Sequence, residues 1–380
     1  MNPIEDKDVL LQNISSSEYF PITYKELEQE AKQTMSVGGF GYVRSGAGNE
    51  ETLRKNEESF SKLSFLPRFL RDVSELDTSV QLFGRTYPYP IFLAPVGMQK
   101  LAHKEGEIAS AKAAATHRVP FVLSTVSSYS IEDVANATGD SPKWFQLYWS
   151  NNEEISFNMV KRAEEAGFEA IVLTIDTPML GWRVEDIRNR FSPLKLGLGK
   201  ANYEADPVFL RSLENQDAES IIQGILNNIN HPTLNWKHVA ALKERTSLPI
   251  LLKGILHPED ARLAVENGID GIIVSNHGGR QLDGVISAID ALPLVVEEIK
   301  GAVPVLFDSG IRRGTDVVKA LALGADAVFI GRPFIYGLAV DGQNGVEKVL
   351  ANFIEETKIS ISLAGISSVK DLPALKIVTS

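Results

Sequence analysis

The chain has 380 residues, of which 44% are hydrophobic and 23% charged, an ordinary composition for a globular protein. It contains no cysteine, so disulfides, thiolate metal sites and catalytic thiols are excluded. Its 38 basic and 49 acidic residues give a formal net charge of -11, which argues against nucleic-acid partners. The sequence shows no secretory signal and no apolar stretch long enough for a membrane span. We therefore expect a cytoplasmic protein without a membrane partner, folded as a single domain over residues 1–380.

The first part of the chain, residues 1–85, carries helical patterns. A glycine-rich stretch, Gly38-Gly39-Phe40-Gly41-Tyr42, lies within it. We expect a helical extension over residues 1–85 that precedes the main domain.

From about residue 90 onward, short apolar runs alternate with helical patterns. The apolar runs are typical of buried parallel strands and cover residues 91–94, 121–123, 144–147, 170–174, 250–253, 271–274, 305–308 and 327–330. The helical patterns cover residues 105–117, 153–166, 235–245, 258–266 and 315–323. Eight strands that alternate with helices predict an α/β fold, a closed (β/α)8 TIM barrel over residues 86–340. An open doubly wound sheet is the alternative that this count disfavours.

The connection after the fourth predicted strand, residues 177–234, is far longer than the few residues that are usual there. Loops of this length commonly carry function, so we expect part of it to cover the active site as a lid. Residues 341–380 are expected to form a C-terminal helical segment.

Every predicted strand ends in polar residues or glycine. Barrel enzymes build their sites at the C-terminal ends of the strands. Residues two apart in an extended strand share a face, so pairs such as Thr174 and Asp176 can point into one site. The segments that follow the seventh and eighth predicted strands, residues 308–314 and 330–333, combine glycines with arginines, which predicts a phosphate site. Two ordinary turns are the alternative. Neither a Rossmann nor a P-loop glycine motif is present.

His277 differs from the other five histidines, which we expect at the surface. It follows the predicted strand 271–274 closely and precedes Gly278-Gly279-Arg280. A titratable base beside a fixed cation at a strand end is a catalytic candidate. Asp176 can hold the imidazole and stabilise its charged form. No set of His, Asp and Glu has the spacing of a metal site, so no metal is expected.

The stretch VSNHGGRQLD at residues 274–283 resembles the signature of the FMN-dependent family that oxidises L-2-hydroxy acids. Other blocks resemble that family in the same order: AP at 94–95, WFQLY at 144–148, LTIDT at 173–177, LKG at 252–254 and FDSGIRRG at 307–314. The resemblance covers about residues 24–372. It implies FMN as the cofactor and a small 2-hydroxy acid and O2 as the partners.

The resemblance also implies roles for single residues. Those expected to hold the flavin ring and ribityl chain are Pro95, Val96, Gly97, Ser124, Gln146, Thr174, Lys253, Ser275 and Asp308. Those expected to hold the phosphate are Gly310, Arg312, Gly331 and Arg332. The substrate carboxylate would lie between Arg183 and Arg280, assisted by Tyr42, and Tyr148 would hydrogen-bond the substrate oxygen. His277, paired with Asp176, would be the base that takes the hydroxyl proton as hydride leaves; a carbanion route uses the same residues with a different first step.

Within the family, Gly181-Trp182-Arg183 and Asn202-Tyr203 favour the lactate 2-monooxygenase type, which converts L-lactate and O2 into acetate, CO2 and water. The alternative is an L-lactate or 2-hydroxy acid oxidase that releases the 2-oxo acid and H2O2. Gly97 stands where many members have alanine, which makes room for oxygen, a retained product or a larger side chain. Val126 stands where an aromatic is common, so bulkier substrates are expected to fit.

Three further alternatives stay open. They are a dehydrogenase with another acceptor, a different FMN barrel such as the isopentenyl diphosphate isomerase type, and a non-catalytic phosphate-binding barrel. Members of the family are commonly tetramers or octamers, so the resemblance implies a homo-oligomer.

Overall fold

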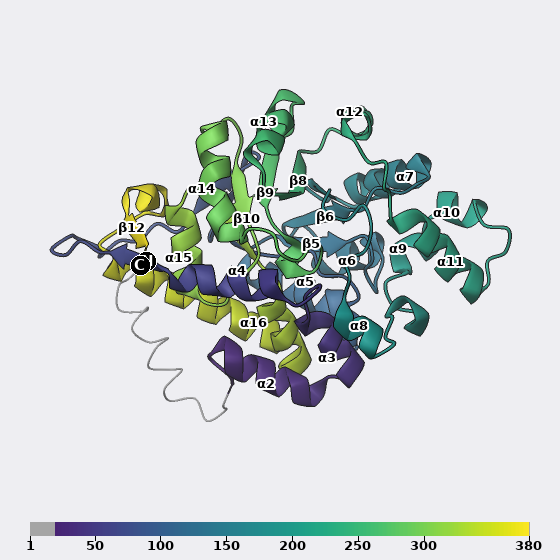
Figure 1. Ribbon diagram of the computed structural model, residues 1–380, viewed down its shortest axis with the longest axis horizontal. Helices are drawn as coiled ribbons and strands as arrows, with labels where there is room; N and C mark the ends of the chain where they lie inside the picture. The colour runs from purple at the N-terminus through teal and green to yellow at the C-terminus, as the bar shows by residue number, and fades with distance from the viewer. Residues whose placement is uncertain (1–19, 380) are drawn as a thin grey trace.

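The computed structural model describes residues 20–379 and is built around a closed barrel of eight parallel strands (Figure 1). The strands follow one another in chain order around the barrel, and the last pairs with the first. They are β4 Ile91–Leu93, β5 Phe121–Ser124, β6 Lys143–Leu147, β7 Ile171–Thr174, β8 Ile250–Ile255, β9 Gly271–Val274, β10 Val305–Phe307 and β11 Ala327–Ile330. The predicted (β/α)8 barrel is confirmed, and each predicted run overlaps one of these strands.

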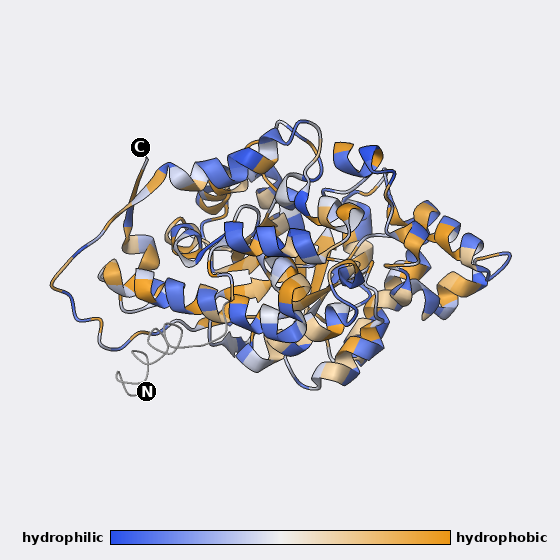
Figure 2. Ribbon diagram, turned by 90° about the horizontal axis from the view of Figure 1, so that it is seen from below, coloured by the Kyte–Doolittle hydropathy of each residue, from blue (hydrophilic) through white to orange (hydrophobic). Residues whose placement is uncertain are grey.

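Helices cover the outer face of the barrel and side chains fill its interior, which is why the strands are continuous apolar runs. Figure 2 shows orange strands in the middle of the molecule and, around them, helices in which blue and orange residues alternate. The surrounding helices are α5 Gly106–His117, α6 Ile131–Thr138, α7 Glu153–Glu165, α12 Trp236–Lys243, α13 Pro258–Glu266, α14 Ala288–Ile299, α15 Gly314–Ala322 and α16 Arg332–Leu363. Sequence patterns missed α6, which is short, and α14, which contains Pro293, a residue that ordinarily disfavours a helix interior.

The N-terminal end of the barrel is closed by a hairpin of β2 (Val80–Leu82) and β3 (Arg85–Tyr87). Phe83 and Tyr87 from this hairpin pack edge-to-face on Trp144, with ring centroids 5.8 and 6.4 Å apart. Trp144 in turn packs on Phe92 and Phe329 inside the barrel. Apolar packing fills this end, so the open end of the barrel is the C-terminal one.

The extension contains the expected helices α2 (Tyr24–Thr34), α3 (Val37–Arg44) and α4 (Glu51–Ser61), but it is not helical throughout. Besides the hairpin, β1 (Leu63–Leu66) pairs antiparallel with β12 (Lys376–Thr379) from the expected C-terminal helical segment. The prediction that residues 341–380 are helical is therefore wrong for residues 376–379, which form a strand. The expected boundary at residues 340 and 341 also falls inside α16, at a kink where Asp341 and Gly342 leave helical geometry. Residues 1–19 and 380 lie outside the described residues.

The long connection after β7 is folded into short helices. They are α8 Val184–Arg188, η2 Leu194–Leu196, α9 Ala201–Glu204, α10 Pro207–Arg211 and α11 Ala218–Ile229. Asn202 of α9 donates to the carbonyls of Ser124 and Thr125 at 3.1 Å each, and Arg162 of α7 pairs with Asp206 at 3.4 Å. The part around α9 and α10 is thus docked on the barrel. Arg183, at the start of α8, is the part of the connection that reaches the mouth of the barrel cavity.

Candidate functional site

A cavity opens at the C-terminal ends of the barrel strands. Its volume, the open mouth included, is about 950 Å³. Natural small-molecule sites span roughly 300–1,000 Å³. Most of the predicted site residues line it: Tyr42, Pro95, Val96, Gly97, Ser124, Tyr148, Arg183, Lys253, His277, Arg280, Asp308, Gly310, Arg312, Gly331 and Arg332. The structure therefore brings residues from both the extension and the strand ends into one cavity.

Four predicted site residues lie behind this lining: Gln146, Thr174, Asp176 and Ser275. The Ser124 hydroxyl donates to Oε1 of Gln146 at 3.0 Å. Thr174 stands opposite Lys253 in the strand register. These four residues adjoin the lining through hydrogen bonds or strand pairing.

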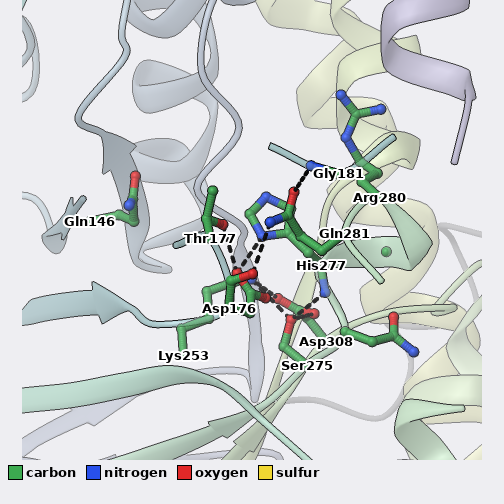
Figure 3. Close-up of polar contacts among 12 residues, drawn as sticks. Gln146, Asp176, Thr177, Gly181, Lys253, Ser275, His277, Arg280, Gln281 and Asp308 are labelled. Atoms are coloured by element: carbon green, nitrogen blue, oxygen red, sulfur yellow. Dashed lines mark hydrogen bonds and ion pairs between the residues drawn. The ribbon is translucent and has the colours of Figure 1, made fainter. Parts of the chain in front are cut away.

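His277 and Asp176 form a hydrogen-bonded pair. Nδ1 of His277 lies 2.9 Å from Oδ1 of Asp176, as Figure 3 shows. Burial lowers the pKa of His277, although the carboxylate of Asp176 opposes this shift. Burial would raise the pKa of Asp176, but the charge of His277 and the hydrogen bonds outweigh it, so that pKa is lowered. At neutral pH the pair is a neutral imidazole and a carboxylate, which leaves Nε2 free to accept a proton.

The loop that carries His277 is held in an uncommon backbone conformation. The φ angle of His277 is 58°, in the left-handed region that costs a non-glycine residue on the order of 1–3 kcal/mol. Two hydroxyls hold the loop: Ser275 Oγ accepts the N–H of His277 and Ser309 Oγ that of Gly278, both at 3.0 Å. Gly279 follows at φ 74°, where a Cβ would lie 2.7 Å from the backbone nitrogen of Leu53. Such strain is typical of functional sites.

Lys253 is a buried cation with fixed partners, and its side chain is 5% exposed. Its Nζ lies 3.0 Å from Oγ of Ser275 and 3.1 Å from Oδ2 of Asp308. Ser275 in turn donates to Oδ1 of Asp308 at 2.5 Å. These contacts place one fixed positive charge on the cavity wall beside the His277 loop (Figure 3).

Two arginines meet at the mouth of the cavity. Arg280 donates to the carbonyls of Tyr42 and Ser45 at 2.5 and 2.8 Å, and its guanidinium lies 4.8 Å from the Tyr42 ring centroid. Arg183 lies 5.8 Å from the same centroid. Burial and the charge of Arg183 lower the pKa of Arg280 to about 9, so it stays charged at neutral pH. The hydrogen bonds of both within residues 20–379 go to carbonyls and to Gln281. Asp186 is an acidic neighbour of both but forms no hydrogen bond with either, so both guanidiniums can bind a carboxylate ligand.

The two arginines of the predicted phosphate site differ in their partners. Arg312 pairs with Glu57 at 2.9 Å and lies over the Tyr24 ring at 4.5 Å. Arg332 donates to the backbone carbonyls of Val43, Ser45 and Gly278 at 2.9–3.2 Å. Both line the cavity, so its inner wall carries positive charge.

Gln281 is a site residue that sequence reasoning missed. Its Nε2 donates to the carbonyls of Asp176 and Met179 at 2.8 and 3.0 Å, and its Oε1 accepts the N–H of Gly181 at 3.2 Å. It therefore ties the segment after β7, which carries Asp176 and Arg183, to the segment after β9. The only signal in the sequence was its place next to Arg280 in the signature stretch.

Gly97 does not open an empty space. A Cβ at Gly97 would lie 2.7 Å from both Cγ2 and the carbonyl oxygen of Val126. Val126 crowds the place of the missing methyl, which agrees with the expected larger side chain rather than with room for oxygen or a retained product.

Other expectations concern metals, membranes and the remaining histidines. Over residues 20–379, no group of three or more His, Asp or Glu side chains is arranged to hold a metal. In the same range, no helix combines the length and the apolar character that crossing a bilayer requires. His231, expected at the surface, is instead buried at 7% exposure and packs on His238 with ring centroids 4.8 Å apart.

Comparisons with known proteins agree with this geometry. The sequence model of the FMN-dependent dehydrogenase family matches residues 31–379. L-lactate oxidase of Lysinibacillus sphaericus (strain C3-41) is 60% identical over 378 residues, 100% of this chain and 98% of that protein. Human (Homo sapiens) 2-hydroxyacid oxidase 1 is 42% identical over 349 residues, 92% of this chain and 94% of that protein. The solved structure of mandelate oxidase with (S)-4-hydroxymandelic acid superposes with a TM-score of 0.87 at 40% identity, covering 95% of this chain and 99% of that one. The chain therefore belongs to the FMN-dependent dehydrogenase family, and FMN is its cofactor.

Proposed function

We propose that the protein oxidises a small L-2-hydroxy acid, with L-lactate as its best substrate, and passes the electrons to O2. The products are then the 2-oxo acid, pyruvate from lactate, and H2O2. One observation carries the proposal: Arg183, Arg280 and the His277–Asp176 pair converge on one cavity. A 2-hydroxy acid offers a carboxylate to the two cations and a hydroxyl to the base.

The cavity fits FMN by the chemistry of its walls. Nε2 of Gln146 is buried and has no partner among the described residues, as expected of a donor to a flavin ring. Lys253 offers a fixed cation for negative charge on the ring. We assign the ring to Pro95, Val96, Gly97, Ser124, Gln146, Thr174 and Lys253, the ribityl chain to Ser275 and Asp308, and the phosphate to Gly310, Arg312, Gly331 and Arg332. Bound FMN supplies a two-electron acceptor next to the substrate site.

The arginines select the substrate and orient it. Charged hydrogen bonds from Arg183 and Arg280 fix the carboxylate, and an alcohol without a carboxylate loses both of them. Burial raises the pKa of Tyr148, so its phenol stays neutral and can donate to the substrate oxygen. These contacts present the hydroxyl of the substrate to His277.

His277 acts as the base. Its neutral imidazole takes a substrate proton at Nε2, that of the hydroxyl in a hydride route, and the carboxylate of Asp176 stabilises the imidazolium that results. The hydride and carbanion routes both use His277 as the base and differ in the bond to hydrogen that breaks first. Loss of two protons and two electrons converts the 2-hydroxy acid into the 2-oxo acid.

Two observations favour the oxidase outcome. The relative that shares 60% identity over the whole chain is named an L-lactate oxidase. The place of the methyl missing at Gly97 is filled by Val126, so this glycine offers no extra volume to retain a product. The second candidate, a lactate 2-monooxygenase, is favoured in the sequence by Gly181-Trp182-Arg183 and Asn202-Tyr203. Arg183 lines the cavity, whereas Asn202 and Tyr203 are buried and lie outside its lining.

Product analysis with L-lactate in air tests the proposal. We expect pyruvate and H2O2 in equal amounts. Acetate and CO2 without H2O2 would make the protein a monooxygenase. Lack of turnover, with no flavin reduction by any 2-hydroxy acid under anaerobic conditions, would overturn the substrate class and favour a different FMN barrel.

A further inference from the structure

We infer that Glu107 is a positioning residue that sets the substrate side-chain pocket by clamping the loops after β4 and β5 together. The inference rests on the proposed oxidation of a 2-hydroxy acid in this cavity. Glu107 is outside the cavity lining and takes no part in the proton transfer described above.

Glu107 lies in the first turn of α5 and its exposed fraction is 0%. Its Oε1 accepts two backbone hydrogen bonds, from the N–H of Gln99 at 3.0 Å and from the N–H of Ser128 at 2.9 Å. Gln99 follows β4 and Ser128 follows β5. A single carboxylate oxygen therefore joins two loops that come from neighbouring strands.

The two loops meet beside these hydrogen bonds, at the cavity wall. The N–H of Met98 donates to the carbonyl of Val126 at 3.0 Å, and Val126 packs on Gly97 too closely for a Cβ. Gly97 and Val126 both line the cavity. The distance between the loops therefore sets how far the Val126 side chain reaches into the space for the substrate.

The side chain of Gln99 extends the clamp to the flavin side of the cavity. Ser110 of α5 donates to Oε1 of Gln99 at 2.7 Å, and Nε2 of Gln99 donates to the carbonyl of Val96 at 2.9 Å. One face of α5 thus holds the loop after β4 at two points, Val96 and Gln99. The carboxylate of Glu107 connects this unit to the loop after β5, beside the Met98–Val126 hydrogen bond.

Burying a carboxylate at this place costs stability, so a purely structural role would not explain it. Oε2 of Glu107 is buried and lies outside the double hydrogen bond of Oε1, with the Ser127 side chain as its neighbour. Burial raises the pKa of Glu107, while the N–H groups of Gln99 and Ser128 favour its charged form. A buried carboxylate costs stability even when it is hydrogen-bonded. We attribute this cost to the double hydrogen bond of Oε1, which fixes both loops at once.

The test compares Glu107→Ala with Glu107→Gln in the FMN-loaded enzyme. The measured quantity is the ratio of kcat/KM for L-lactate to kcat/KM for larger L-2-hydroxy acids, 2-hydroxybutyrate and mandelate. We expect Glu107→Ala to shift this ratio about tenfold toward the larger acids, the size of effect that a methylene group has in a specificity pocket. Glu107→Gln should keep the ratio within about twofold, because its amide oxygen can still accept both N–H groups.

A second readout does not depend on turnover. The Kd values of pyruvate and phenylglyoxylate, 2-oxo acids of different size, can be measured from the change in the spectrum of oxidised flavin on binding. In Glu107→Ala, the Kd of phenylglyoxylate should fall relative to that of pyruvate. If Glu107→Ala does not fold, Glu107→Asp replaces it, since a side chain shorter by one methylene cannot reach both N–H groups.

Asp326→Ala is the control, at an exposed carboxylate that also accepts a backbone N–H. It removes a carboxylate that accepts the N–H of Val305 at 2.8 Å, at the N-terminal end of β10 and β11. It should lower the melting temperature and leave the ratio unchanged. An unchanged ratio in Glu107→Ala as well would overturn the inference. Lack of turnover in the unmodified protein would instead overturn the proposed function, and the two Kd values would then decide the inference.

Discussion

The two ends of the barrel differ in the side chains that fill them. At the N-terminal end, Phe83, Tyr87 and Trp144 pack edge-to-face and bury apolar surface. At the C-terminal end, His277 has a left-handed backbone and Lys253 is a buried charge. Apolar packing stabilises the fold, whereas strained residues and buried charges cost stability. The comparison teaches that stability is concentrated at one end of the barrel and chemistry at the other.

Replacement of His277 tests the catalytic end with the largest expected effect. His277→Asn removes the base, so kcat/KM for L-lactate should fall by about 10²–10⁴. FMN content and melting temperature should change little, because the side chain belongs to the reaction rather than to the core. His257→Asn is the control: His257 is exposed and caps α13, a role that asparagine can fill. A loss of stability without a loss of activity in His277→Asn would contradict the comparison.

The opposite result is expected at the closed end. Tyr87 is 1% exposed and packs on Phe92 with ring centroids 5.2 Å apart. Tyr87→Ala should lower the free energy of unfolding by about 3–5 kcal/mol, as for other buried aromatic rings. Denaturant unfolding measures this effect. The kcat of the folded, FMN-loaded fraction should stay near that of the unmodified protein; a large loss of kcat would show that the two ends are coupled.

Asp176 allows a test by pH. Because the base must be neutral, kcat/KM should fall as the pH drops through the pKa of His277, which burial places below its ordinary value. Asp176→Asn removes the charge that favours the imidazolium, so the acid limb should move to lower pH. The maximum kcat/KM should fall by about tenfold or more, since the imidazolium loses its counter-ion. A limb that moves to higher pH would contradict the pairing of His277 with Asp176.

Gln281 should show the smallest effect. Gln281→Leu removes the hydrogen bonds that join the segments after β7 and β9, and with them a contact to Arg183 at 3.4 Å. KM for L-lactate should rise by roughly three- to tenfold, with a smaller change in kcat, because each hydrogen bond contributes about 0.5–1.5 kcal/mol. Gln343→Leu, in α16 and away from the cavity lining, is the control. Equal changes of KM in both variants would show that Gln281 has no specific role in the site.

Sequence patterns predicted the barrel because strands buried on both faces are apolar runs that local composition reveals. They also grouped most of the cavity residues, since strand ends meet at one edge. They missed the pairing of β1 with β12, whose two strands lie far apart in the sequence. Gln281 and Glu107 were missed for a related reason. Both act through hydrogen bonds to backbone groups of distant loops, which leave no periodicity in the sequence.

Anaerobic reduction of the bound flavin tests the central claim most directly. L-lactate should bleach the flavin absorbance of the unmodified protein. Arg183→Met should keep its FMN, because Arg183 is assigned to the substrate carboxylate, and should not be reduced at the same lactate concentration. Reduction of Arg183→Met at the rate of the unmodified protein would contradict the claim that this cavity holds a 2-hydroxy acid between its two arginines.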